Sequence, residues 1–163
     1  MLQIKIKDRF LLGVISGLFG TIPVDALNSA QYRMGLTDRK YAHMAARFFT
    51  PKERTILGPV ANETLNTSIG VMIAYALSAS GRDFAALKGA GVGALYWFTL
   101  YGLTTGLGLL PKSKKPLSSI LGFTDHLIAG ATIGMIAGKL GDDSLFPDNK
   151  IKTVEEKTPL IFH

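Results

Sequence analysis

The sequence contains no cysteine and little charge. Without cysteine, disulfides, thiolate metal sites and cysteine nucleophiles are excluded. Charged residues make up 18% of the 163 residues, whereas soluble domains usually carry about 25%. Three stretches, residues 10–24, 69–81 and 89–111, contain no Asp, Glu, Lys or Arg. A soluble helix spreads its charges along one face, so charges confined to the gaps between apolar blocks indicate an integral membrane protein.

Motifs for catalysis and cofactor binding are missing as well. There is no G-x-S-x-G nucleophile motif, and Gly89-Ala-Gly-Val-Gly93 is a run of small residues inside an apolar block instead of a phosphate loop. A bis-histidine haem site needs two imidazoles facing each other within a bundle. Of the histidines, only His126 lies in an apolar block, while His43 and His163 lie outside. We therefore expect no enzyme activity, no metal and no cofactor.

The net charge of +6 allows two kinds of partner. A basic protein can bind nucleic acid, but Lys and Arg also gather in cytoplasmic loops and beside anionic lipid headgroups. The apolar blocks favour the second explanation. We expect membrane lipids as partners and no nucleic acid.

Four apolar blocks are long enough to cross a bilayer, since a helix needs ~20 residues to span ~30 Å of hydrocarbon. The first follows a basic N-terminus in the manner of a signal peptide. We expect it to be retained as a transmembrane helix with a kink at Pro23. The sequence thus predicts an all-α protein, an integral membrane bundle of four transmembrane helices in one domain, residues 1–140. The expected spans are residues 10–31, 56–79, 84–110 and 117–140, and a polar extramembranous tail follows at 141–163.

A basic amphipathic segment, residues 38–49, connects the first two spans, with Thr37 as its expected N-cap. A helix of this kind lies in the membrane interface, and a solvated loop helix is the alternative. Residues 50–53 form a capping box that begins the second long helix. The positive-inside rule, applied to the three connections and the two ends of the bundle, favours both termini outside. The two faces of the segment carry Arg39, His43 and Arg47 on one side and Tyr41, Met44, Ala45 and Phe48 on the other.

Glycines four residues apart mark the faces on which we expect helices to pack. Lipid tails are as apolar as leucine, so membrane helices associate through close approach and hydrogen bonds between helices. The fourth span has the longest such ridge, and its partner is either another helix of this chain or a neighbouring protomer. The pairs are Gly13 with Gly17, Gly89 with Gly93 and Gly102 with Gly106, and the ridge is Gly122, His126, Gly130, Gly134 and Gly138.

Polar residues inside the spans are costly, at ~2.5–3.5 kcal/mol for a charged side chain, and usually face the bundle interior or water. The first span ends on the side where the second and fourth begin, so the polar groups of all three share one depth. They form either a site that relays protons or holds a cation, or a structural hydrogen-bond network. The expected cluster is Asp25, Asn28, Asn62, Glu63, Asn66, Asp125 and His126.

The fourth span contains the run Asp125-His126-Leu-Ile-Ala-Gly130-Ala-Thr-Ile-Gly134-Met-Ile-Ala-Gly138. With the glycine-rich first span, this run resembles small polytopic bacterial inner-membrane proteins of the YagU-like kind. The resemblance implies a bacterial inner membrane and four helices, and it assigns no catalytic residue.

Three functions remain open on the sequence. The leading hypothesis is a structural or accessory subunit of a membrane assembly or homo-oligomer, because small-residue faces are abundant and catalytic motifs are absent. The second is a proton- or cation-coupled transporter or channel using Asp25, Glu63 and His126. The third is a membrane enzyme that acts on a lipid or quinone at the polar cluster.

Overall fold

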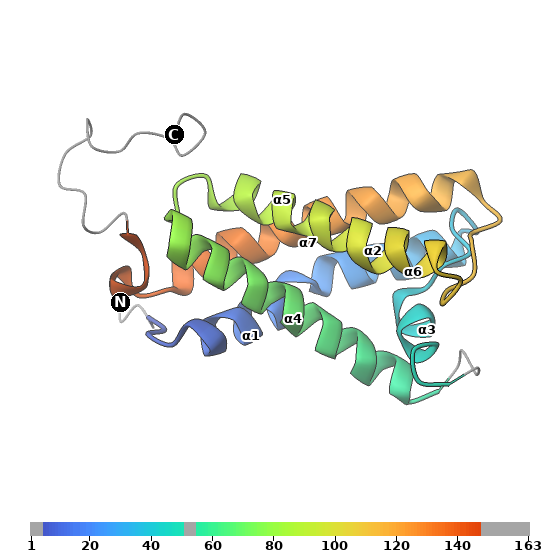
Figure 1. The fold of residues 1–163 in the computed structure, drawn as a ribbon, viewed down its shortest axis with the longest axis horizontal. Coiled ribbons are helices and arrows are strands. Elements are labelled where there is room, and N and C mark those ends of the chain that lie inside the picture. The colour runs from blue at the N-terminus through green and yellow to red at the C-terminus, as the bar shows by residue number, and fades with distance from the viewer. Residues whose placement is uncertain (1–4, 51–54, 148–163) are drawn as a thin grey trace.

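The computed structural model describes residues 5–50 and 55–147, and over these residues the protein is all-α, without a strand. The long helices lie roughly alongside one another, and α4 crosses the others obliquely (Figure 1). In chain order the elements are α1 Arg9–Gly20, α2 Ile22–Arg33, α3 Tyr41–Ala46, α4 Leu57–Ser80, α5 Ala85–Trp97, the π-helical η1 Phe98–Leu103, α6 Thr104–Gly106, α7 Pro116–Leu140 and the 3₁₀ turn η2 Asp143–Leu145.

The first expected span consists of two helices that meet at Thr21. The carboxylate of Asp8 caps α1 by accepting a hydrogen bond from the Leu11 amide at 2.6 Å. Pro23 lies in the first turn of α2, where its missing N–H is not needed. A continuous helix would require that donor, so the break falls just before the proline.

Among the described residues, two helical segments, Arg9–Arg33 and Pro116–Leu140, are long and apolar enough to cross a membrane, with mean hydropathy of 1.8 and 1.5. The other two expected spans are less apolar or less regular than these two segments. α4 has 24 residues, but its first half is polar, and the helix begun by α5 is interrupted after Trp97.

The interruption after Trp97 is the π-helical turn η1. Threonine hydroxyls in and around it donate to carbonyls four residues earlier: Thr99 to Leu95 at 3.1 Å and Thr105 to Tyr101 at 2.5 Å. Such bonds compete with the regular helical ladder and bend helices. A single straight helix over residues 84–110 does not form, since α-helical geometry ends at Trp97 and resumes only at Thr104.

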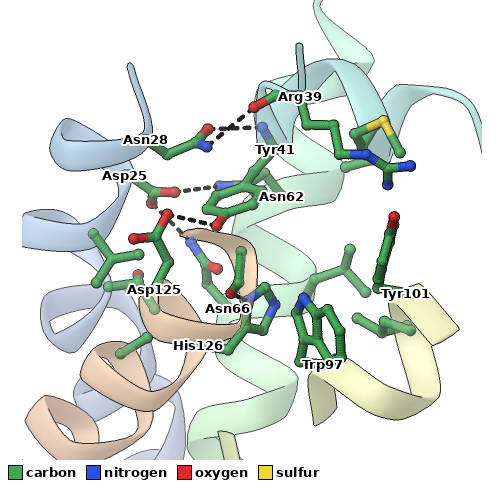
Figure 2. A pocket seen from close by; sticks show the side chains of 18 of the residues that line it. Asp25, Asn28, Arg39, Tyr41, Asn62, Asn66, Trp97, Tyr101, Asp125 and His126 are labelled. Atoms are coloured by element: carbon green, nitrogen blue, oxygen red, sulfur yellow. Dashed lines mark hydrogen bonds between the residues drawn. The ribbon is translucent and has the colours of Figure 1, made fainter. Parts of the chain in front are cut away.

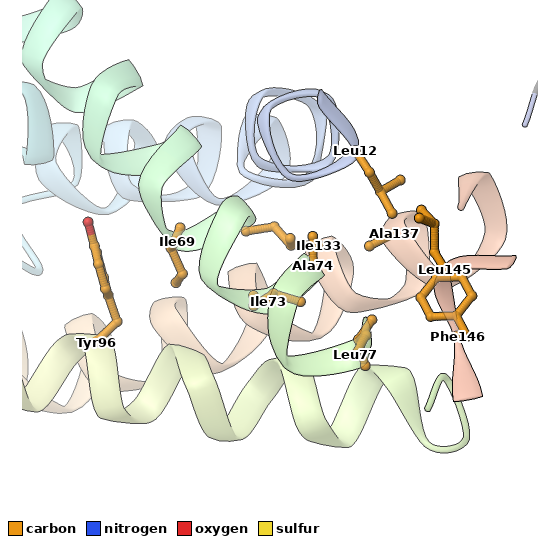
Figure 3. Close-up of a cluster of buried hydrophobic side chains, with 10 residues drawn as sticks. All are labelled: Leu12, Ile69, Ile73, Ala74, Leu77, Tyr96, Ile133, Ala137, Leu145 and Phe146. Atoms are coloured by element: carbon orange, nitrogen blue, oxygen red, sulfur yellow. The ribbon is translucent and has the colours of Figure 1, made fainter. Parts of the chain in front are cut away.

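The apolar core lies where α1, α4, α5 and α7 meet (Figure 3). Leu12, Ile73, Leu77 and Ile133 are fully buried there. Each such side chain contributes roughly 1.5–3 kcal/mol when it leaves water. Close packing of the helices accompanies this burial.

Glycines provide that packing along two helix pairs. On α7, a Cβ on Gly130 would overlap the carbonyl oxygen of Gly89 in α5, and one on Gly134 would overlap that of Ala85. Between α1 and α4, a Cβ on Gly70 would overlap the Gly13 carbonyl. The remaining glycines of the expected packing faces either lie along these two seams, the contacts between α5 and α7 and between α1 and α4, or face open space. Gly17 lies against Asn66, Gly93 against the His126 carbonyl, Gly122 near the Trp97 indole and Gly138 near Ala85, whereas Gly102 and Gly106 have nothing within 4 Å.

The segment after α2 differs from the expected surface helix. The helix covers only Tyr41–Ala46, and its N-cap is Lys40 instead of Thr37. It packs on α4, where a Cβ on Gly58 would overlap the Ala42 carbonyl. Arg39, expected on the polar face, is buried because the chain folds back over the bundle end. Most of the expected capping box at 50–53 lies outside the described residues.

The expected polar tail begins with residues that belong to the folded unit. The Ile6 amide donates to the Leu140 carbonyl and the Asp142 amide to the Ile6 carbonyl, both at 2.9 Å. Phe146 is buried in the core cluster, and Arg82 forms an ion pair with Asp143 at 2.6 Å. The boundary expected at residue 141 is therefore too early, and the rest of the tail, from residue 148, lies outside the described part.

Candidate functional site

A cavity of about 120 Å³ lies at the bundle end formed by α3, η1 and the connection into α7. Its walls come from α2 along most of its length, the N-terminal halves of α4 and α7, the end of α5, and α3. Figure 2 shows side chains from these elements converging on one space. Segments far apart in the sequence thus build a single site.

Asp125 of α7 lies on one side of the cavity and is only 1% exposed. Its two carboxylate oxygens accept hydrogen bonds from the Gln31 amide at 3.0 Å and the Tyr41 hydroxyl at 2.7 Å. Burial, and then the nearby Asp125, raise the pKa of the Tyr41 phenol well above its ordinary value. Tyr41 therefore remains a hydrogen-bond donor across the physiological range.

A second carboxylate, Asp25 of α2, lies beside the first (Figure 2). The Asn62 and Asn66 side-chain amides, one turn apart on α4, donate to its two oxygens at 3.2 and 3.0 Å. Asn28, one turn after Asp25, donates to the Arg39 carbonyl at 3.1 Å and accepts from the Tyr41 amide at 3.0 Å. This asparagine fixes the α2–α3 connection over the cavity.

Arg39 lies on the opposite side of the cavity from both carboxylates (Figure 2). The residue is 8% exposed. One guanidinium nitrogen donates to the Pro111 carbonyl at 2.6 Å, and the guanidinium stacks on the Tyr101 ring, 4.1 Å from its centroid. Burial lowers the pKa of Arg39 from its ordinary value, opposed by Tyr101 and Asp38, and arginine stays charged nonetheless.

Aromatic rings form the wall between the two ends. His126 donates from Nδ1–H to the Gly122 carbonyl at 2.7 Å. Its ring lies edge-on to Tyr41 at 5.6 Å and tilted to Tyr96 at 6.4 Å. Trp97, the single tryptophan of the chain, lines the same cavity. The wall is therefore apolar in its faces and polar only at its edges.

Six of the seven residues expected in the polar cluster line this cavity, namely Asp25, Asn28, Asn62, Asn66, Asp125 and His126. Glu63 does not, because the helical step after Asn62 turns it to the exposed side of α4. The sequence reasoning missed Gln31, which continues the Asp25–Asn28 face at three-residue spacing and was detectable. It also assigned Arg39 and Tyr41 to a surface helix.

Two buried atoms of the site have no partner among the described residues, Gln31 Oε1 and Arg39 Nε. Buried polar atoms are nearly always satisfied in folded proteins, so this polar set is incomplete on its own. Within residues 5–50 and 55–147, no group of three or more His, Asp or Glu side chains is placed to hold a metal ion. The arrangement suits a ligand that brings its own hydrogen-bonding groups.

Comparisons with known proteins found no matching family model, no matching curated protein and no matching solved structure.

Proposed function

We propose that the protein is a multi-pass membrane protein whose four long helical segments all cross the bilayer. Each segment exposes large apolar side chains, for example Phe19, Val60, Leu95 and Ile120, and lipid covers such groups without cost. The polar side chains Asn62 and Asn66 of α4 bond Asp25 within the bundle, which lets a partly polar helix cross lipid. The resemblance to YagU-like proteins supports a bacterial inner membrane.

We infer further that the protein binds a small polar molecule in the end cavity. The observation that carries this is the incomplete polar lining, with Gln31 Oε1 and Arg39 Nε unpartnered beside a space of about 120 Å³. A purely structural network would gain by satisfying its buried atoms, since each unmet group costs about 1–3 kcal/mol. Binding sites of this type combine apolar walls with a few polar groups. This favours a ligand-binding role, as in a transporter or receptor subunit, over a purely structural one.

The tryptophan offers a direct test, because Trp97 lines the cavity and is the only one in the chain. Purified protein in lipid nanodiscs is titrated with small charged solutes, including phosphate, acetate, ethanolamine and zwitterions that combine these groups, while Trp97 emission is followed. A saturable change that is lost in Arg39→Gln but kept in Arg33→Gln supports binding, since Arg33 is exposed and lies outside the cavity. Emission that stays constant with every solute would overturn the proposal.

A second candidate, a subunit of a homo-oligomer or larger membrane assembly, rests on open glycine positions of α5, η1 and α6. Gly91, Gly102 and Gly106 have nothing within 4 Å of the position a Cβ would occupy. Small residues on an open helix surface allow another helix to approach closely. The mass of the protein in mild detergent tests this, and a monomer without a co-purifying partner would count against it.

A further inference from the structure

The cavity keeps opposite charges apart instead of pairing them. Arg39 bonds a backbone carbonyl and an aromatic ring, while Asp25 and Asp125 accept only from amides and a phenol. No ion pair joins Arg39 to either carboxylate in the described residues. Buried charges are normally paired, because an unpaired one costs several kcal/mol. Within the cavity, neither end therefore supplies a counter-charge to the other, and the carboxylate that acts on Arg39, Asp38, lies outside the lining.

The Arg39 end suits an oxyanion. A guanidinium presents five N–H donors in a planar fork that matches carboxylate and phosphate oxygens, and only one bond, to the Pro111 carbonyl, is made here. Stacking on Tyr101 fixes the plane of the fork, 4.1 Å from the ring centroid. Thr37 holds the same segment in place by accepting from the Arg39 amide at 3.1 Å. The Arg39 guanidinium is therefore held in place, while most of its N–H groups make no hydrogen bond among the described residues.

The carboxylate end suits an ammonium group. Each oxygen of Asp125 and Asp25 accepts one bond from a neutral donor, and none accepts from a cationic side chain among the described residues. An ionised carboxylate has about four acceptor sites, so each has capacity left for a cation. The rings of Tyr41, Tyr96 and His126 adjoin this end, and aromatic faces attract ammonium groups.

We propose that the cavity binds a zwitterion, with its oxyanion on Arg39 and its ammonium group against Asp125 and Asp25. This inference rests on the proposed ligand-binding function and names the ligand class of the same site. Neither end alone explains the arrangement, because a simple anion would leave two carboxylates unpaired and a simple cation would leave Arg39 unpaired. Gln31 Oε1, unpartnered beside Asp125, adds an acceptor for an ammonium N–H.

This chemistry occurs both in small solutes and in zwitterionic lipid headgroups, and the cavity lies at one end of the bundle, near the expected depth of headgroups. A small solute and a lipid headgroup of this kind would both present an oxyanion and an ammonium group to the cavity. Only the headgroup would be supplied by the surrounding bilayer.

The test compares zwitterions with their single-charge fragments in one protein, by Trp97 emission in phosphatidylglycerol nanodiscs. The probes are phosphoethanolamine and γ-aminobutyrate, against phosphate, acetate and ethanolamine. At least one zwitterion should bind about 10-fold or more tightly than either of its fragments, since a hydrogen bond to a charged group contributes about 1.5–3 kcal/mol. Because each comparison uses the same protein, a change in folding cannot produce the ratio.

Substitutions at each end of the cavity test which group of the zwitterion binds there. Asp125→Asn should reduce zwitterion affinity to that of the anionic fragment, and Arg39→Gln should reduce it to that of ethanolamine. Asp83→Asn, an exposed carboxylate outside the cavity, is the matched control and should change neither. Apparent zwitterion affinity that falls in phosphatidylethanolamine nanodiscs identifies the headgroup as the ligand, and affinity equal in both lipids identifies a solute.

The outcomes separate this inference from the proposed function. If phosphate or acetate binds as tightly as its zwitterion, or Asp125→Asn leaves the ratio unchanged, the cavity binds a ligand but the zwitterion assignment is wrong. If no probe changes Trp97 emission, the ligand-binding function itself fails, and the inference with it.

Discussion

Asp125 shows how single residues hold the site together. Its carboxylate is almost fully buried and depends on two neutral donors from distant parts of the chain, Gln31 and Tyr41. Removing one donor from a buried charged acceptor leaves that acceptor partly unsatisfied, which costs more than an ordinary hydrogen bond. The position of α3 over the cavity therefore rests partly on one phenol.

Tyr41→Phe removes that donor with little change in shape. We expect a loss of about 1–3 kcal/mol in the free energy of unfolding, measured by chemical or thermal denaturation in detergent. Tyr75→Phe on α4 is the matched control, because Tyr75 is half exposed and lies outside the cavity. Equal stability of the two variants would contradict the role given to the Tyr41–Asp125 bond.

At the scale of elements, close backbone approach joins α5 to α7 and α1 to α4. The expected ridge on α7 lies against α5, so its partner in this structure is within the chain. Gly102 of η1 and Gly106 of α6, by contrast, face open space, because the π-helical turn changes the rotation of the residues that follow it. Glycines four residues apart in the sequence therefore predict a helix-packing ridge only where the helix keeps regular α-helical geometry.

Gly130→Ala tests the α5–α7 seam. The new methyl group would meet the Gly89 backbone, which cannot move aside as a side chain does, so we expect a loss of about 1–3 kcal/mol or more. Gly91→Ala, on the open side of α5, should be neutral or slightly stabilising, since alanine favours helix. Thermal unfolding followed by circular dichroism measures both, and similar melting temperatures for the two variants would contradict the packing.

Asp38 links two connecting segments near the cavity. It accepts from the Ser113 hydroxyl at 2.5 Å, the Lys114 amide at 2.8 Å and the Ser118 hydroxyl at 3.0 Å. Burial is the largest single influence and opposes ionisation, but the hydrogen bonds together outweigh it and lower the pKa of Asp38 below its ordinary value of 3.8. A lowered pKa stabilises the fold above the ordinary value, and that contribution disappears as the pH falls through the folded-state pKa.

The wild type should therefore lose stability relative to Asp38→Asn as the pH falls from about 5 to below 3.8, the ordinary pKa. Melting temperatures of both proteins across this range provide the measurement. The effect is small because Asp38 is exposed. A difference in melting temperature that does not change with pH would show that the bonds form equally to the protonated acid.

For the whole molecule, the sequence predicted the all-α class and most of the polar cluster, because both follow from local spacing and chain direction. Asp25, Asn62 and Asp125 meet since their helices begin or end at the same side. Arg39 and Tyr41 escaped prediction because their burial depends on how residues 34–50 fold back over other elements. That path is set by distant partners such as Asn28 and Pro111, which no local pattern encodes.

The number of membrane crossings determines on which side of the bilayer each connection of the bundle lies. If all four long segments cross, the connection after α4 and the connection before α7 lie on opposite sides. If only Arg9–Arg33 and Pro116–Leu140 cross, both connections lie on the same side. The absence of cysteine makes the chain suited to single-cysteine labelling.

The decisive measurement is the labelling of Asp83→Cys and Lys112→Cys, both at exposed positions, by a membrane-impermeant maleimide on intact and permeabilised cells. Four crossings predict that one variant is labelled in intact cells and the other only after permeabilisation. Labelling of both from the same side would contradict the four-helix membrane bundle.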